Sequence, residues 1–249
     1  MSRVGTQHEA EVIRIEAGDT QGAGRYDRWA HRRGEPRQLI VWWSIYLFFA
    51  SMLSLGGMGY IGLVGYEVFR PATIILLSMT GIGLSILWPM VRLSQVPPTD
   101  PSGSFALDGF VVLVPALVVL AAQSMPWMAG WPATVSLTIG ASYFSWSAAI
   151  AALLAIYYMR LTSWIPRWLW MLHILVLVSA GPVIAAMASP LGASPKMIET
   201  LLMLSPLTAP FEAAADRTWL GVSARVESHH IAAAFAPLVL VFVAVGKKR

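Results

Sequence analysis

The sequence predicts an all-α polytopic membrane protein with six transmembrane helices and with short amphipathic helices before the last one. The first reason is that six apolar runs each approach or exceed the ~20 residues that cross a bilayer. The second is composition, because 57% of the residues are hydrophobic and 12% are charged, about half the charged fraction of a soluble domain. The runs cover residues 39–65, 71–91, 108–126, 133–159, 168–189 and 229–246.

Residues 1–38 are hydrophilic, and we expect a cytoplasmic N-terminal segment here rather than a cleavable signal peptide. Residues 25–38 are strongly basic, and Tyr26 and Trp29 share one helical face. This pattern is typical of a short interfacial helix, and equally of a basic anchor beside a first span. Both interpretations put the segment on the cytoplasmic side. The basic residues are Arg25, Arg28, Arg32, Arg33 and Arg37.

Basic residues near the other spans predict the orientation of the transmembrane domain, residues 39–249. Arg92 follows the second run, Arg160 and Arg167 separate the fourth from the fifth, and two lysines and an arginine close the sequence. With six spans, all of these residues lie on the side of the N-terminal arginines. Because basic loops stay in the cytoplasm, we expect both termini inside, in a bacterial plasma (inner) membrane.

Small residues recur along the first and fourth runs, where they would let helix backbones approach closely. We therefore expect these two spans to be the most buried, packed either within one chain or across an oligomer. The packing candidates are Gly56, Gly59 and Gly62 in the first run and Gly140, Ser145 and Ala149 in the fourth.

Residues 190–228 are too polar to span a bilayer and form an outer amphipathic segment. Ser194 and Pro195 predict the start of a helix, Pro206 ends it, and Pro210 starts a second short helix. Two such helices either lie on the headgroups or form a re-entrant hairpin, a lid over a pathway. The lid candidates are Met197, Leu201, Pro206 and Phe211.

The predicted spans contain no Asp, Glu, Lys or Arg in their hydrophobic cores. Ion-coupled carriers place charged groups at mid-membrane, so the pattern argues against a secondary transporter, a proton pump or a selective ion channel. Asp108 stands where the third run begins, and we expect it to cap that helix.

The sequence also lacks the common motifs for cofactor binding and catalysis. The chain has no cysteine, phosphate loop, zinc-protease motif or nucleophile elbow, so we expect no catalytic residue and no cofactor. His173 is predicted near the inner boundary, whereas His229 and His230 open the last run on the outer side. Across a core of about 30 Å they cannot share one haem iron. Two alternatives stay open: a haem or metal shared with another subunit, and a metal bound by His229 and His230 at the outer surface.

The architecture resembles the permease subunit of ABC-type exporters of the ABC-2 kind. The matching features are six spans with both ends inside, the basic lead-in 25–38, and the helices of residues 195–219 before the last span. The resemblance implies a separate cytoplasmic ATPase that contacts the lead-in and inner loops, and an outer hairpin that caps the exit path. The contact candidates are Arg25, Arg28, Arg32, Arg33, Arg92 and Arg160.

The main alternative is a membrane anchor or scaffold subunit of a larger complex, for example a respiratory one. Few polar groups inside the spans and a largely apolar surface fit that function as well. A membrane-embedded enzyme is a third alternative. We expect a homo- or hetero-oligomer in a lipid bilayer and no nucleic-acid partner.

Overall fold

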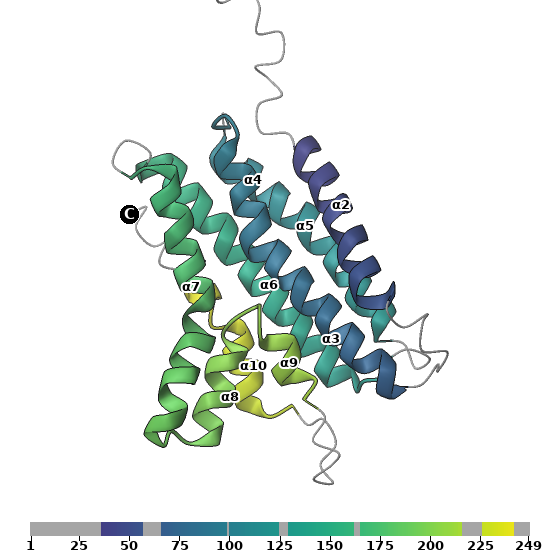
Figure 1. The fold of residues 1–249 in the computed structure, drawn as a ribbon. Helices are drawn as coiled ribbons and strands as arrows, with labels where there is room; N and C mark the ends of the chain where they lie inside the picture. The colour runs from purple at the N-terminus through teal and green to yellow at the C-terminus, as the bar shows by residue number, and fades with distance from the viewer. Residues whose placement is uncertain are drawn as a thin grey trace, which may run out of the picture.

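The computed structural model describes residues 36–56, 66–98, 100–124, 129–161, 165–215 and 226–241, and in these ranges the regular structure is helical (Figure 1). The predicted all-α fold is confirmed. Several predicted contact and packing residues lie outside the described residues, so the structure says nothing of them. They are Arg25, Arg28, Arg32, Arg33, Gly59 and Gly62.

Among the described residues, five helices are long and apolar enough to cross a membrane. The second span is continuous across three segments, and a one-turn π-helix extends the fourth. The chain is therefore an integral membrane protein by length and composition of its helices. The elements are α2 (Arg37–Leu55), α3 (Tyr66–Ile82) with η3 (Gly83–Leu87) and α4 (Trp88–Ser94), α5 (Pro101–Gln123), α6 (Ala133–Ile156) with η4 (Tyr157–Leu161), and α7 (Arg167–Ala188) with η5 (Ser189–Leu191).

The last predicted span is described only in part. Helix α10 (Ser228–Phe235) continues through a turn to Val241, and this apolar piece is shorter than a membrane span. Residues 242–246 of the predicted run lie outside the described residues. Between α7 and α10 the structure contains the two short helices that the sequence predicts, α8 (Pro195–Met203) and α9 (Ala209–Ala213). The Ser194 hydroxyl caps α8 by accepting the Met197 N–H at 3.3 Å.

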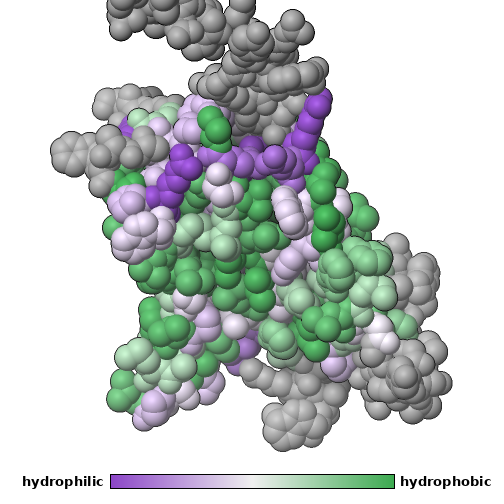
Figure 2. Space-filling model, turned by 45° about the horizontal axis from the view of Figure 1, so that its top comes forward, coloured by the Kyte–Doolittle hydropathy of each residue, from purple (hydrophilic) through white to green (hydrophobic). Residues whose placement is uncertain are grey.

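Helix α6 forms the centre of the bundle, and α5 covers one side of it (Figure 1). In the most apolar 18-residue stretch of α6 with η4, 61% of the residues are buried, whereas in the corresponding stretch of α2 only 22% are buried. Span 4 thus lies where its small residues suggested, but the described part of span 1, residues 37–56, lies at the edge of the bundle. Its outer face exposes Phe48, Phe49 and Leu53. Figure 2 shows a hydrophilic band at one end and a largely apolar surface below it, as expected of a protein that lipid surrounds.

The π-helical turn η3 widens the second span directly before Pro89. Proline has no N–H to donate, and its ring clashes with the carbonyl one turn earlier, so a wider turn relieves the clash. Hydroxyls from two other helices donate to carbonyls just before this turn: Tyr46 to Met79 at 2.6 Å, and Tyr143 to Leu77. These bonds satisfy backbone groups that lipid could not satisfy.

A buried ion pair ties the same span to α5. The Arg92 guanidinium donates two hydrogen bonds to the two carboxylate oxygens of Asp108, and both side chains are buried. Arg92 also donates to Gln95 Oε1 at 2.6 Å. The sequence predicts that Asp108 caps α5, and this prediction is wrong. Asp100 caps that helix by accepting the Gly103 N–H at 3.2 Å, and the helix begins seven residues earlier than the predicted span.

We expect Asp108→Leu to lower the free energy of unfolding by about 3–5 kcal/mol, because it leaves the Arg92 charge buried without its counter-ion. The double variant Arg92→Met with Asp108→Leu should recover most of that loss. Asp100→Ala, which removes a carboxylate from an exposed cap, should cost only about 1 kcal/mol. Denaturant unfolding in detergent measures all three. Equal stability of the Asp108→Leu and Asp100→Ala variants would show that the pair is not buried.

Candidate functional site

The segment between α8 and α9, residues 204–208, breaks a helical hairpin inside the bundle. Helix α8 packs against α7 and rises from the turn at Gly192 (Figure 1). Its nine residues span about 14 Å at ~1.5 Å per residue, which is about half of a ~30 Å hydrocarbon core. The break then lies against residues near the middle of three membrane-length helices: Gly81, Trp146 and Gly181. If lipid covers these helices along their length, we infer a re-entrant hairpin that ends near mid-depth.

Two glycines let the hairpin backbone approach this closely. A Cβ atom at Gly81 would lie 2.2 Å from the carbonyl oxygen of Pro206, and a Cβ atom at Gly181 would lie 2.3 Å from that of Leu201. Such distances are too short for any side chain, and the obstructing atoms are backbone atoms. Only glycine fits at these two positions while the hairpin is in place.

Hydrogen bonds satisfy the backbone of the break, as they must at membrane depth. The Trp146 indole N–H donates to the Leu204 carbonyl at 3.0 Å. The Thr208 hydroxyl donates to the Leu202 carbonyl at 2.6 Å, and the Ser205 hydroxyl accepts the Leu207 N–H at 3.2 Å. Irregular backbone is tolerated in a bilayer only where protein or a water-filled cavity surrounds it. Here the surrounding groups are protein side chains.

The predicted lid residues differ in how far they are buried in this hairpin. Pro206 is buried at the break and Leu201 is half-buried, whereas Met197 and Phe211 are each 49% exposed. On the inner side, Met203 and the alanines of α9 are buried against the bundle. The hairpin thus enters the bundle, and the alternative in which both helices lie on the headgroups does not fit this burial.

Helix α10 packs against both α6 and α8 and connects the hairpin to the centre of the bundle. The buried Ser145 hydroxyl of α6 donates to the Ala234 carbonyl of α10. Two other packing candidates on α6 also make helix contacts: Ala149 is fully buried, and a Cβ at Gly140 would meet a leucine of α5 at 3.5 Å. Gly56, in contrast, is exposed with no atom near its would-be Cβ.

The structure also places two of the proposed partner contacts. Arg160 is exposed in η4, at the end of α6, whereas Arg92 is buried in the pair with Asp108. The connection between α4 and α5 covers only residues 95–100. It leaves no room for a separate docking helix, and Arg92 is not presented to a soluble partner.

The three described histidines lie at opposite ends of the bundle. His173 is exposed within the first two turns of α7 and stacks on Trp170, with ring centroids 5.2 Å apart. His229 and His230 open α10, beside α8 and therefore near the other end of α7. The two sets cannot ligate one metal atom within a single chain, as the sequence had indicated.

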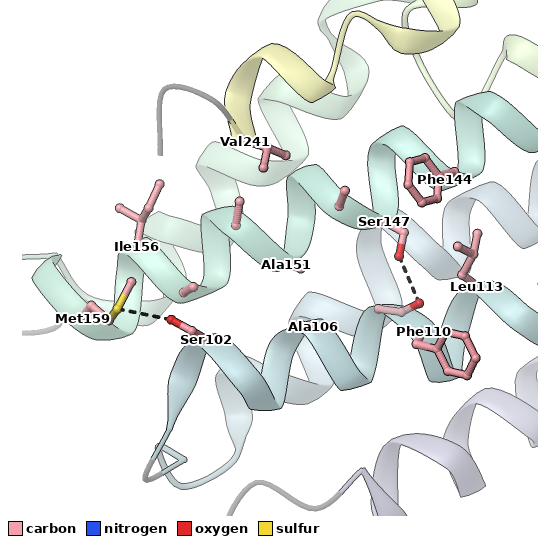
Figure 3. Close-up of a pocket in the computed structure, with 14 residues that line it drawn as sticks. Ser102, Ala106, Phe110, Leu113, Phe144, Ser147, Ala151, Ile156, Met159 and Val241 are labelled. Carbon is pink, nitrogen blue, oxygen red and sulfur yellow. Dashed lines mark hydrogen bonds between the residues drawn. The ribbon is translucent and has the colours of Figure 1, made fainter. Parts of the chain in front are cut away.

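A groove of about 510 Å³ runs between α5 and α6 and reaches Val241 (Figure 3). Small residues line it, and its two serine hydroxyls point to protein acceptors. Ser147 donates to the Gly109 carbonyl at 3.1 Å, and Ser102 lies 3.6 Å from the Met159 sulfur. Its described lining holds no ionisable side chain. The groove therefore suits an apolar chain rather than chemistry on a polar substrate.

No protein-family model, no curated protein and no solved structure matches this chain. The function must therefore be inferred from the site itself.

We expect Gly81→Ala and Gly181→Ala each to lower the free energy of unfolding by about 1–3 kcal/mol, because the added methyl group displaces the hairpin backbone. Gly140→Ala, where a methyl group makes ordinary contact, is the matched control and should be neutral or slightly stabilising. Denaturant unfolding in detergent compares the three variants. Equal stabilities would mean that the hairpin does not touch α3 and α7 in solution.

Proposed function

We propose that this chain is the permease subunit of an exporter of the ABC-2 kind and works with a separate ATPase. The observation that supports this function best is the re-entrant hairpin between the fifth span and α10. It corresponds to the outer helical hairpin that the resemblance implies before a last span. Here it reaches mid-depth instead of resting above the membrane.

A broken helix at mid-depth is a feature of transport proteins. Transporters build their pathways from interrupted helices, because the interruption exposes backbone groups where an intact helix offers none. The break at residues 204–208 places such groups beside the π-helical span, near Gly81. An anchor that only holds its partners in the membrane has no need of this arrangement.

The energy for transport would come from a partner. The groups shown against the break carry no charge: Trp146 of α6 donates to the Leu204 carbonyl, and Gly81 and Gly181 pack against the hairpin backbone. A coupling ion would need charged or chelating groups there. Nucleotide hydrolysis by a separate subunit supplies energy without such groups.

The proposed orientation puts the ATPase at the end where α2 begins. The first residue of α2, the last residues of α4 and α6, and the start of α7 meet at this end (Figure 1). Because arginines gather there, we assign it to the cytoplasm of a bacterial plasma membrane, with both termini inside. The docking surface would combine the basic segment 25–38 with Arg160. The arginines at this end are Arg37, Arg92, Arg160 and Arg167.

One observation favours the second candidate, an anchor subunit of a larger membrane complex. The connection between α4 and α5 is only six residues long, residues 95–100, and is too short to form a helix on which an ATPase could dock. The exposed apolar face of α2 would then be a surface for another membrane subunit. The two candidates differ in the partner that each requires.

We expect an ATPase to co-purify with the chain from native membranes in mild detergent. Reversing Arg28, Arg32 and Arg33 to Glu should reduce its recovery by about tenfold or more, because like charges then oppose association. Reversal of Lys247, Lys248 and Arg249 to Glu is the matched control, with the same change in charge, and should retain the ATPase. Co-purification of haem-bearing or iron–sulfur subunits without an ATPase would contradict the exporter and support the anchor.

A further inference from the structure

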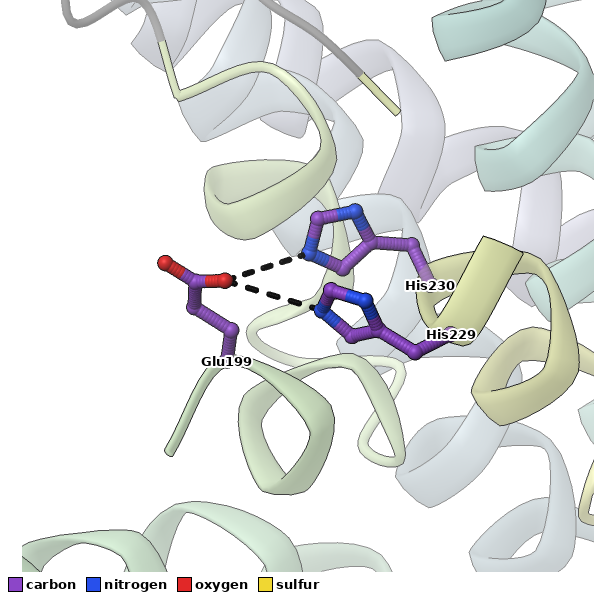
Figure 4. Close-up of side chains that lie close together, drawn as sticks. All are labelled: Glu199, His229 and His230. Carbon is purple, nitrogen blue, oxygen red and sulfur yellow. Dashed lines mark ion pairs between the residues drawn. The ribbon is translucent and has the colours of Figure 1, made fainter. Parts of the chain in front are cut away.

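Two histidines and a glutamate meet where the hairpin touches the last helix (Figure 4). Glu199 lies on α8, and His229 and His230 lie in the first turn of α10. The Glu199 Oε2 atom is 3.6 Å from His229 Nε2 and 3.8 Å from His230 Nε2. One ligand atom from each residue lies within 4.8 Å of the others. These residues are 30 positions apart in sequence, and only the return of the hairpin brings them together.

The cluster is largely buried. The side chains of Glu199, His229 and His230 are 16%, 12% and 7% exposed, whereas that of the adjacent Glu227 is 57% exposed. Burying a carboxylate is costly unless it meets a cation or donors. The site therefore provides an anionic ligand and two imidazoles in a protected place.

We propose that Glu199, His229 and His230 bind a divalent transition-metal ion of the zinc class. Imidazole nitrogen and carboxylate oxygen are ligands that Zn²⁺ prefers, and three protein ligands leave a fourth position for water. At tetrahedral bond lengths of about 2.0–2.1 Å, ligand atoms lie about 3.3 Å apart. The two separations from Glu199, 3.6 and 3.8 Å, are close to this value, and all three ligand atoms lie within 4.8 Å of one another. Side-chain rotations that bring the ligand atoms together would therefore complete the site.

Glu227 prepares His229 as a ligand. Its carboxylate lies 3.2 Å from His229 Nδ1, although the present orientation of the two groups forms no hydrogen bond. A small reorientation would let Glu227 accept the Nδ1 proton and leave Nε2 free to bind the ion. Metal-bound histidines commonly have a carboxylate of this kind at their second nitrogen, because it fixes the tautomer and raises the basicity of the ligand.

His230 needs one rearrangement. Its Nδ1 accepts the backbone N–H of Glu227 at 3.1 Å, as part of a capping box at the start of α10. The neutral ring therefore carries its proton on Nε2. Coordination through Nε2 moves that proton to Nδ1 and breaks the capping bond. One neutral hydrogen bond is worth about fivefold in an equilibrium constant, which is small beside the affinity of a zinc site.

The inference is independent of the ATPase partner, because it concerns one contact within this chain. A bound ion would join α8 to α10 and so hold the hairpin to the last helix. Glu199 moves with the hairpin, while both histidines belong to α10. Metal occupancy would therefore stabilise the inserted position of the hairpin.

The test is titration of tag-free protein with Zn²⁺ by calorimetry, and with Co²⁺ by visible absorption, in detergent. We expect one ion per chain, a tetrahedral Co²⁺ spectrum and a Tm that rises with Zn²⁺. Glu199→Gln and His229→Gln should each weaken binding by about 100-fold, and Glu227→Gln by about tenfold. His173→Gln, which removes an exposed histidine from α7, is the matched control and should bind as the parent does.

The Tm without metal shows whether each variant is folded, and Glu199→Gln and His229→Gln are two independent probes of the same site. Absence of binding by the parent protein would overturn the proposal. An equal loss in His173→Gln, or full affinity in both Glu199→Gln and His229→Gln, would overturn it as well.

Discussion

Lipid cannot hydrogen-bond to a peptide group, and this constraint governs the arrangement around the hairpin. The chain interrupts a helix near mid-depth, so every backbone group of residues 204–208 that leaves a helix must find a partner inside the protein. Trp146 supplies one donor, and the hydroxyls of Ser205 and Thr208 act within the turn. Glycines at positions 81 and 181 let two spans close over the break without side chains between them.

The same constraint explains why the neighbouring span is irregular. Pro89 cannot donate a backbone hydrogen bond, and the π-helical turn before it changes the pairing of nearby carbonyls. Tyr46 and Tyr143 donate to carbonyls in the preceding turns. A Cβ at Gly81 would lie 3.6 Å from the Tyr143 ring as well as against Pro206. The hairpin break and the irregular span thus pack directly against each other, and both contact α6.

Much of this fold could be predicted from local signals. Apolar runs located the long helices, and Ser194 with Pro195 marked the start of α8 because capping depends only on adjacent residues. The start of α5 carries the same signal in Asp100 and Pro101, and attention to that pair would have placed the helix correctly. Asp108 would then have been recognised about two turns inside the helix, where a charge needs a partner.

Contacts between distant elements could not be predicted in this way. The glycines of span 1 predicted close packing, but Gly56 meets no neighbour among the described residues, since small residues permit contact without specifying a partner. The Arg92–Asp108 pair and the Glu199–histidine cluster depend on which helices lie side by side. That information lies in the tertiary arrangement, not in the spacing of the residues.

The central claim is that the α8–α9 hairpin lies within the membrane, and the accessibility of single cysteines in lipid nanodiscs tests it most directly. The chain contains no native cysteine. Phe211 in α9 is 49% exposed and Leu191 in the turn before α8 is 85% exposed, so burial inside the protein protects neither. Nanodiscs present both membrane faces to the reagent. We expect Leu191→Cys to react with a charged, water-soluble maleimide, and Phe211→Cys to react only with an apolar, lipid-soluble one. Equal reaction of both positions with the charged reagent would show that the hairpin rests on the membrane surface.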